Sequence, residues 1–161
     1  MDAAKNIATH KVSLDPYRLE SRRILACIAD TLPSNQQKIE KAGIDEVFLD
    51  LSAQVHSILV ERFPELALPG PHDDRTENLP LPPTTALDWQ ADALVDLDTD
   101  ETEEDDPDWD DIVMLIGSEI VRNVRAAVRE RLKYTCSAGV AQNKMLGQYI
   151  TRPNSQDFHG V

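Results

Sequence analysis

The chain has 161 residues, 41% of them hydrophobic, and carries a formal net charge of −13 at pH 7. This length suits one domain with a real core. No apolar run approaches the ~20 residues that span a bilayer, and the N-terminus lacks the hydrophobic region of a secretory signal, which predicts a soluble intracellular protein without membrane contact. Cys27 and Cys136 lie far apart without a CxxC motif. This spacing argues against a disulfide framework or zinc site and predicts two buried free thiols.

The net charge is concentrated in one segment. Thirteen acidic residues and no Lys or Arg occur between Asp88 and Asp111, which leaves 16 acidic against 16 basic residues elsewhere. From Gly117 to Val161 there are seven basic and three acidic residues. The acidity of the whole chain therefore does not argue against a nucleic-acid partner.

The first predicted element is a helix over residues 15–32. Asp15 followed by Pro16 forms a favourable pair of N-cap and first helical residue, and Pro33 ends the helix. Between these signals, apolar residues recur at helical spacing. They are Tyr17, Ile24, Leu25, Ile28 and Leu32.

A short extended segment around Ile39 is expected next, followed by Gly43 and a strand over residues 47–49. The strand is indicated by Val47, Phe48 and Leu49, which are β-branched, aromatic and apolar. A short helix over residues 55–60 is expected to follow.

Residues 64–107 predict a long disordered insertion. Six prolines lie between Pro64 and Pro83, and the acidic run follows them. Neither half has the periodicity of a packed helix or strand.

The most regular pattern begins at Asp111 and predicts a helix that ends near residue 132, with Asp110 or Asp111 as its cap. Residues 134–141, YTCSAGVA, are then expected to form a buried strand, and Asn143 is expected to cap a short helix over residues 144–150. The apolar face of the long helix consists of Ile112, Ile116, Ile120, Val124, Val128 and Leu132.

Two adjacent carboxylates, Asp45 and Glu46, precede the second strand. Magnesium prefers carboxylate oxygens and is usually held by one or two carboxylates together with substrate phosphates, and two such ions can promote phosphoryl transfer. Neighbouring strand residues point to opposite faces, so both reach one site only if the backbone bends, as Gly43 would allow. The alternative is a solvent-facing turn before an ordinary strand. Asp50 is interpreted as a strand-end residue or as a hydrogen-bond partner of a ligand, and it is left out of the site.

Basic residues offer two kinds of candidate phosphate contact. Arg122, Arg125 and Arg129 form a stripe that could meet phosphates or could be the solvated face of an amphipathic helix. Lys144 and Arg152, which follow the last predicted strand, are the better candidates. The four histidines have no ligand spacing, so a histidine metal site is not expected.

Three stretches, KVSLDPYRLESRRIL, IEKAGIDEVFLDLS and YTCSAGVAQNKML, resemble in the right order the palm of Y-family translesion DNA polymerases. The resemblance is closest to the eta-type enzymes of fungi, which carry a similar Pro-rich and acidic insertion, and it covers most of residues 11–62 and 108–154. It implies an α+β fold, a partial ferredoxin-like palm with helices on one face of an antiparallel sheet.

The resemblance also implies a function. Asp45 and Glu46 correspond to carboxylates that bind two catalytic Mg²⁺ ions, and Arg152 stands where the family has a lysine that contacts the triphosphate of the incoming nucleotide. The implied protein is a nuclear DNA-directed DNA polymerase that copies a damaged DNA primer-template with deoxynucleoside triphosphates.

Several features depart from the family pattern. Gly43 replaces the usual serine, and the chain is about three residues shorter between Lys144 and Pro153. Nothing before Lys11 resembles the family's first strand with its metal-bridging Asp, and the finger, thumb and little-finger segments are not recognised. We therefore expect little or no activity from these residues alone.

The expected organisation has two palm parts separated by the insertion. An alternative function is a non-catalytic product of the same family that binds a protein partner through the acidic insertion or the palm surface. Another palm-type nucleotidyltransferase or cyclase is a third option, against which SAGVAQNK argues. The expected divisions are a disordered N-terminus over 1–10, palm parts over 11–63 and 108–154, the insertion over 64–107 and a tail over 155–161.

Overall fold

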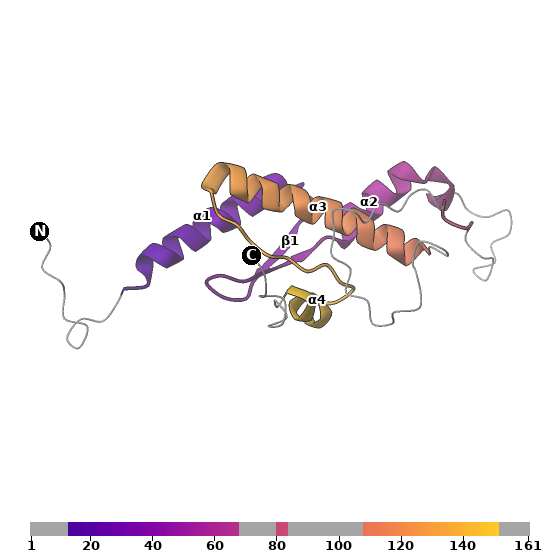
Figure 1. The fold of residues 1–161 in the computed structure, drawn as a ribbon. Coiled ribbons are helices and arrows are strands. Elements are labelled where there is room, and N and C mark those ends of the chain that lie inside the picture. The colour runs from indigo at the N-terminus through magenta and orange to yellow at the C-terminus, as the bar shows by residue number, and fades with distance from the viewer. Residues whose placement is uncertain (1–12, 68–79, 84–107, 152–161) are drawn as a thin grey trace, which may run out of the picture.

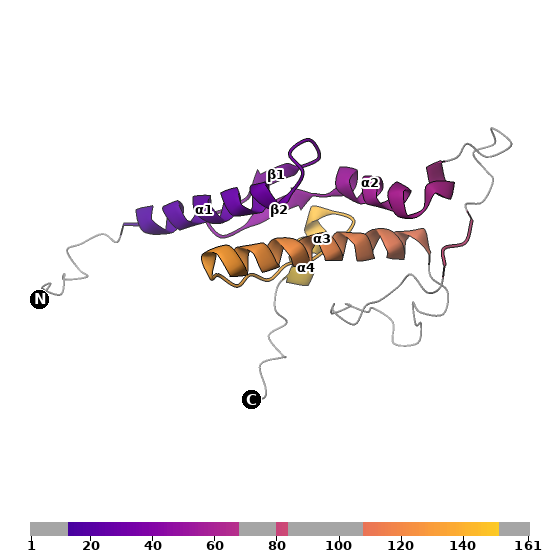
Figure 2. The ribbon, with the colours of Figure 1, turned by 90° about the horizontal axis from the view of Figure 1, so that it is seen from above.

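The computed structural model describes residues 13–67, 80–83 and 108–151. In this part of the chain, helices surround a small antiparallel sheet of two strands, in agreement with the expected α+β class (Figure 1). Helices α1 and α2 follow each other in one row, and α3 lies alongside both (Figure 2). The elements are α1 (Asp15–Thr31), β1 (Lys38–Lys41), β2 (Val47–Asp50), α2 (Ser52–Arg62), the 3-10 helix η1 (Pro64–Ala67), α3 (Trp109–Leu132) and α4 (Lys144–Thr151).

The core is centred on α3. The predicted apolar face of this helix is confirmed, and Ile116 in its middle is 0% exposed. Burying an aliphatic side chain of this size contributes about 1.5–3 kcal/mol, so the face of α3 is a main source of stability. The buried cluster consists of Cys27, Ile28, Leu32, Val55, Ile112, Ile116, Ile120, Val124 and Val128.

Helix α1 forms where it was predicted, but its cap differs. Leu14 is the N-cap residue, and Asp15 is already helical. The Ser13 hydroxyl accepts a hydrogen bond from the Asp15 backbone N–H at 3.2 Å and donates to Oδ2 of the same residue at 3.0 Å. The expectation that Asp15 caps the helix is therefore wrong by one residue, because Ser13 satisfies the amide at this end.

Helix α3 begins earlier than expected. Asp108 is its N-cap and forms a capping box with Asp111, so the predicted cap at Asp110 or Asp111 is wrong, although Asp111 takes part as the third helical residue. Trp109 is the first residue of the helix. Its ring packs edge-on against Phe63, with 5.1 Å between the ring centroids, and its Nε1–H donates to the Pro80 carbonyl at 2.6 Å. These tertiary contacts extend the helix toward its N-terminus.

The hairpin of β1 and β2 has two different faces. Ile39 pairs with Leu49 and both pack against the core, whereas Glu40 pairs with Phe48 on the opposite face. Lys144 of α4 contacts Glu40 and Phe48 on that second face. The expected arrangement with helices on one face therefore describes the core side of the hairpin but not α4, which lies on the other side.

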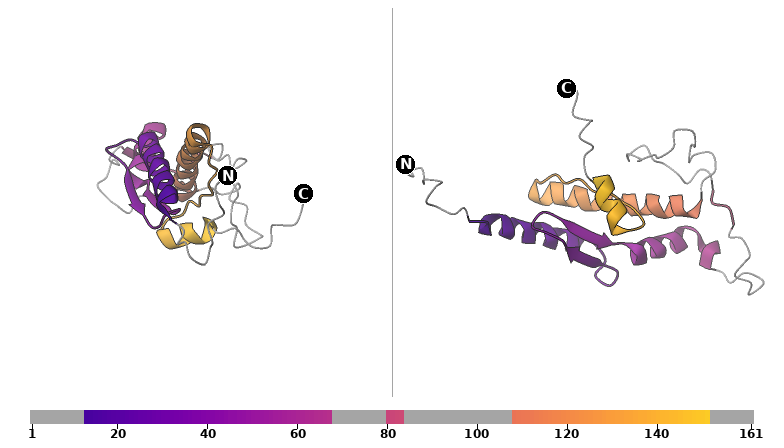
Figure 3. Two further views of the ribbon diagram at one scale, coloured as in Figure 1. Left: turned by 90° about the vertical axis from the view of Figure 1, so that its left-hand side faces the viewer. Right: turned by 90° about the horizontal axis from the view of Figure 1, so that it is seen from below.

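The segment from Lys133 to Asn143 corrects another expectation. Lys133 ends α3 in the left-handed conformation with φ 64°, and the chain then runs back along α3 to α4 (Figure 3). Arg125 Nε donates to the Cys136 carbonyl at 2.9 Å. The predicted buried strand over residues 134–141 is wrong: this segment has no strand partner within the described ranges, and most of it is exposed.

The two thiols differ in burial, because only Cys27 lies in the core. Cys27 is buried in the core, as expected, but Cys136 is exposed on the returning segment. Val140 of that segment lies beside α3, and a Cβ added at Gly117 would come within 3.1 Å of its Cγ1 atom. Glycine at position 117 thus allows the close approach that positions α4.

Helix α4 forms as predicted, and the Asn143 side chain accepts the Leu146 backbone N–H at 3.0 Å, which confirms its cap. Within the expected insertion, Pro64–Ala67 form η1 and Pro82 is buried. The rest of the insertion, the N-terminal 1–10 and the tail lie outside the described residues. Among the helices described, none has the length and hydropathy required to cross a membrane.

Candidate metal-binding site

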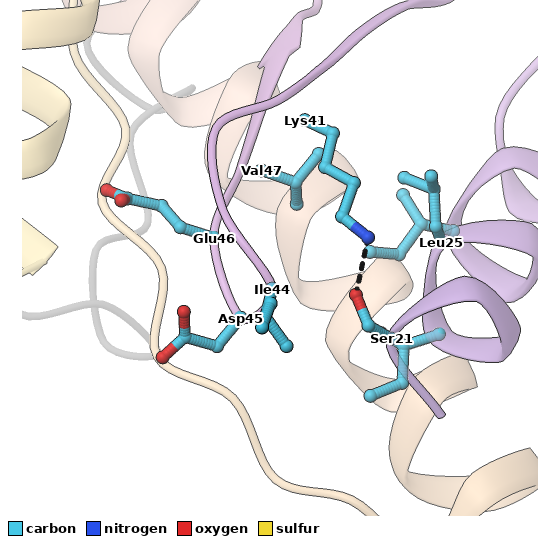
Figure 4. A pocket seen from close by; sticks show the side chains of 9 residues that line it. Ser21, Leu25, Lys41, Ile44, Asp45, Glu46 and Val47 are labelled. Carbon is cyan, nitrogen blue, oxygen red and sulfur yellow. Dashed lines mark hydrogen bonds between the residues drawn. The ribbon is translucent and has the colours of Figure 1, made fainter. Parts of the chain in front are cut away.

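The turn between β1 and β2 brings the two candidate carboxylates together. The backbone N–H groups of Ala42 and Gly43 both donate to the Glu46 carbonyl, at 3.1 and 3.2 Å. This bend precedes β2, so the side chains of Asp45 and Glu46 do not have to point to opposite faces as neighbours in a regular strand do. Figure 4 shows both carboxylates on the side of the turn that faces away from Ser21 and Leu25 of α1.

Both carboxylates are exposed and differ in their protein contacts. Glu46 Oε1 accepts a hydrogen bond from Gln148 Nε2 at 3.0 Å. Asp45 accepts none from the residues that the structure describes, and no Lys or Arg of these residues pairs with either carboxylate. Lys41, which is nearby, points toward α1 and donates to the Ser21 hydroxyl at 2.8 Å (Figure 4). The negative charge of the turn is therefore left available to an external cation.

A hollow between the turn and α1 lies behind the carboxylates. Its volume is about 70 Å³, and its walls include Ile28 of α1 as well as Ile44 and Val47 of the hairpin. Ligand sites for organic molecules are several times larger, roughly 300–1,000 Å³. A nucleotide would thus have to approach the carboxylates from their exposed side.

The donor set fits part of a magnesium site. Two carboxylates that face the same side are the protein ligands that Mg²⁺ commonly uses, with phosphates and waters as the others. No group of three or more His, Cys, Asp or Glu residues suited to a metal occurs in 13–67, 80–83 and 108–151. Asp45 and Glu46 would hold the ion, and further ligands would come from elsewhere.

Of the two candidate phosphate ligands, the structure describes only Lys144. Lys144 forms an ion pair with Glu40, and its Nζ lies 5.4 Å from the centre of the Phe48 ring, so it contacts the outer face of the hairpin. Arg152 lies outside the described residues. Sequence reasoning missed Gln148, although its position four residues after Lys144 places both on one face of α4.

Comparison with known proteins identifies the family. The model of the impB/mucB/samB family matches residues 1–152. The chain belongs to the impB/mucB/samB family. Several curated proteins are similar to this chain. The N-acetyltransferase eso1 of Schizosaccharomyces pombe is 37% identical to it over 154 residues, which cover 91% of the chain. DNA polymerase eta of Saccharomyces cerevisiae is 31% identical over 178 residues (96% of the chain), and that of Arabidopsis thaliana is 29% identical over 156 residues (92% of the chain).

The chain spans only a part of the length of these relatives. It covers 17% of the length of eso1, 27% of the yeast polymerase and 21% of the plant polymerase. The match lies over the same residues that carry the hairpin, α3 and α4. The expected resemblance to Y-family polymerases of the eta type is thereby confirmed.

The arginine stripe of this family member has contacts inside the protein. Arg125 is tied to the Cys136 carbonyl, and Arg122 Nη1 lies 3.4 Å from the Ser118 hydroxyl. Arg125 therefore joins α3 to the returning segment, and the bond of Arg122 lies within α3. Their use as phosphate contacts stays a hypothesis.

Asp50, at the other end of β2, has two partners within the protein. It pairs with Lys38 at 3.1 Å and accepts the Ser52 backbone N–H at 3.0 Å. The Ser52 hydroxyl and backbone N–H, followed by the Lys38 ammonium, lower the pKa of the Asp50 carboxyl from 3.8 to about 2. These contacts support its interpretation as a strand-end residue.

Proposed function

We propose that these residues form part of the palm of a translesion DNA polymerase and that Asp45 and Glu46 are two of its catalytic carboxylates. The observation that carries the proposal is the turn before β2, where both carboxylates face one side without a basic partner in the described part of the chain. The names of the polymerase relatives support the same reading. The substrates would be deoxynucleoside triphosphates and a damaged primer-template, and the place of action the nucleus.

The chain's own contribution would be positioning. A bound Mg²⁺ pair would supply positive charge to the attacking and leaving oxygens of nucleotidyl transfer. Asp45 and Glu46 would hold these ions on a turn whose following strand packs on the core through Val47 and Leu49. This packing would keep the ligands in place, and such preorganisation is a major source of rate enhancement in phosphoryl transfer.

Basic residues near α4 would contact the nucleotide phosphates. We propose Arg152 for the triphosphate, because its fixed positive charge suits a phosphate. Lys144 would take part only if it left Glu40 and the Phe48 ring, the groups that it contacts in this structure. Arg152 is accordingly the stronger candidate of the two.

We further propose that the 161 residues alone do not extend a primer. They offer two carboxylates at the turn, whereas the resemblance implies a third that bridges both ions. The polymerase relatives are also several times longer than this chain. A local excess of four positive charges from Gly117 to Val161 would give only weak, salt-sensitive binding to DNA.

Primer extension tests the proposal. The chain should be compared with a longer protein in which it is joined to the remaining parts of a eta-type polymerase, in Mg²⁺ and with a primed template. The longer protein should extend the primer, and Asp45→Ala or Glu46→Ala should reduce the rate by about 10²–10³-fold, as for other groups that stabilise charge in the transition state.

Asp50→Asn is the matched control, since it removes a carboxylate at the other end of the same strand. Its rate should stay close to that of the unsubstituted protein. Activity that survives Asp45→Ala would contradict the assigned site. A longer protein that folds and binds DNA without extending the primer would instead favour the non-catalytic alternative.

A further inference from the structure

Helix α4 contacts the hairpin through two side chains one helical turn apart. Lys144 pairs with Glu40 of β1, and Gln148 donates to Glu46 at the turn. Residues four apart lie on the same face of a helix, so a single face of α4 covers the outer side of the hairpin and reaches the candidate metal ligands. The hydrogen bond from Gln148 joins residues 102 positions apart in sequence.

The bond leaves Glu46 able to bind a cation. Gln148 uses only Oε1, and no other residue of 13–67, 80–83 and 108–151 donates to Oε2, which keeps its lone pairs for a cation. The amide of Gln148 is neutral, which means that it orients the carboxylate without cancelling its charge. By contrast, Lys38 neutralises Asp50.

From this geometry we propose that Gln148 is a positioning residue for metal binding: it holds the Glu46 carboxylate in the orientation that receives the ion. The inference rests on the proposed function, because it assumes that Asp45 and Glu46 bind metal. Hydrogen-bond partners of metal-ligating carboxylates typically change metal affinity by about 10–100-fold when they are removed. Glu46 is exposed, so the same bond adds little to folding.

The test is an NMR titration of the whole 161-residue chain with Mg²⁺, which follows the backbone amides of Asp45 and Glu46 and the side-chain amide of Gln148. Gln148→Met removes the donor while it keeps the length of the side chain. Gln148→Lys keeps a donor of similar reach but adds a positive charge that would compete with the ion, as Lys38 does at Asp50. Gln142→Met places the same substitution on an exposed residue before α4 as the matched control.

We expect Gln148→Met to weaken Mg²⁺ binding at the turn about 10-fold, Gln148→Lys to weaken it at least as much, and Gln142→Met to bind within about threefold of the unsubstituted chain. The urea midpoint of Gln148→Met should stay unchanged, which a merely structural role would not predict. Equal Mg²⁺ affinity of Gln148→Met and the unsubstituted chain would overturn the role of Gln148 alone. Absence of any Mg²⁺-dependent shift at Asp45 and Glu46 in the unsubstituted chain would overturn the proposed site, and the role of Gln148 with it.

Discussion

The two ends of β2 carry carboxylates in opposite situations. Asp50, at the end of the strand, has a lysine partner and accepts a hydrogen bond from the Ser52 backbone N–H. Asp45 and Glu46, before its start, share one neutral donor from the described residues. The protein contacts of a carboxylate near a strand thus indicate its role. A carboxylate that already contacts a cation and a backbone amide has a structural role, whereas a carboxylate without a cationic partner is available to bind a metal ion.

The largest expected effect tests whether the core holds both ends of the strand. Ile116→Ala should lower the free energy of unfolding by about 2–5 kcal/mol, because it opens a cavity beside fully buried neighbours. Asp45→Ala should change it by less than about 0.5 kcal/mol, since the side chain is exposed. Urea unfolding followed by circular dichroism measures both.

Ile116→Val provides a milder core change if the alanine variant does not fold, with an expected loss of about 0.5–1.5 kcal/mol. A loss for Asp45→Ala as large as that for Ile116→Val would contradict the comparison. It would mean that the carboxylate at the turn has a structural role like that of Asp50.

Much of this fold follows from local pattern. The face of α3 around Ile116 and Val124 was predicted because a long helix with one apolar face can be buried in only one way. The strand at Val47 and the turn at Gly43 were predicted from residue type and spacing. The carboxylates Asp45 and Glu46 could be predicted to lie together for the same reason, because neighbours in sequence stay neighbours in space.

What could not be predicted depends on contacts between distant residues. Small and apolar residues around Ser137 and Val140 suit a buried strand, but a strand needs a pairing partner, and this segment instead follows α3. The cap of α3 moved to Asp108 because Trp109 packs against Phe63. Gln148 escaped notice since nothing near it in sequence indicates Glu46.

A second prediction compares cation binding at the two ends of β2. Isothermal titration of the chain with Mn²⁺ should show weak binding that decreases at least about 10-fold in an Asp45→Ala, Glu46→Ala double variant, because both ligands are lost. Asp50→Asn should bind like the unsubstituted chain, since Lys38 and Ser52 already occupy that carboxylate. Equal binding by the double variant would assign the metal to the 13 carboxylates between Asp88 and Asp111 instead.

The smallest effect concerns Asp50 and pH. Because folding lowers the pKa of this carboxyl from 3.8 to about 2, its contribution to stability is fully present above pH 3.8 and is lost as the pH falls through 2. The side chain is 43% exposed and screened by solvent, so the contribution stays below about 1 kcal/mol. Asp50→Asn should therefore be less stable than the unsubstituted chain at pH 7, and the two urea curves should converge between pH 4 and pH 2. High salt should reduce the part that comes from Lys38 and leave the hydrogen bonds from Ser52.

At pH 7, Asp45→Asn is the matched control and should have the stability of the unsubstituted chain. A stability difference for Asp50→Asn that persists unchanged at pH 2 would show that the loss comes from packing or from the amide itself, and the contrast between the two ends of β2 would then not be one of charge.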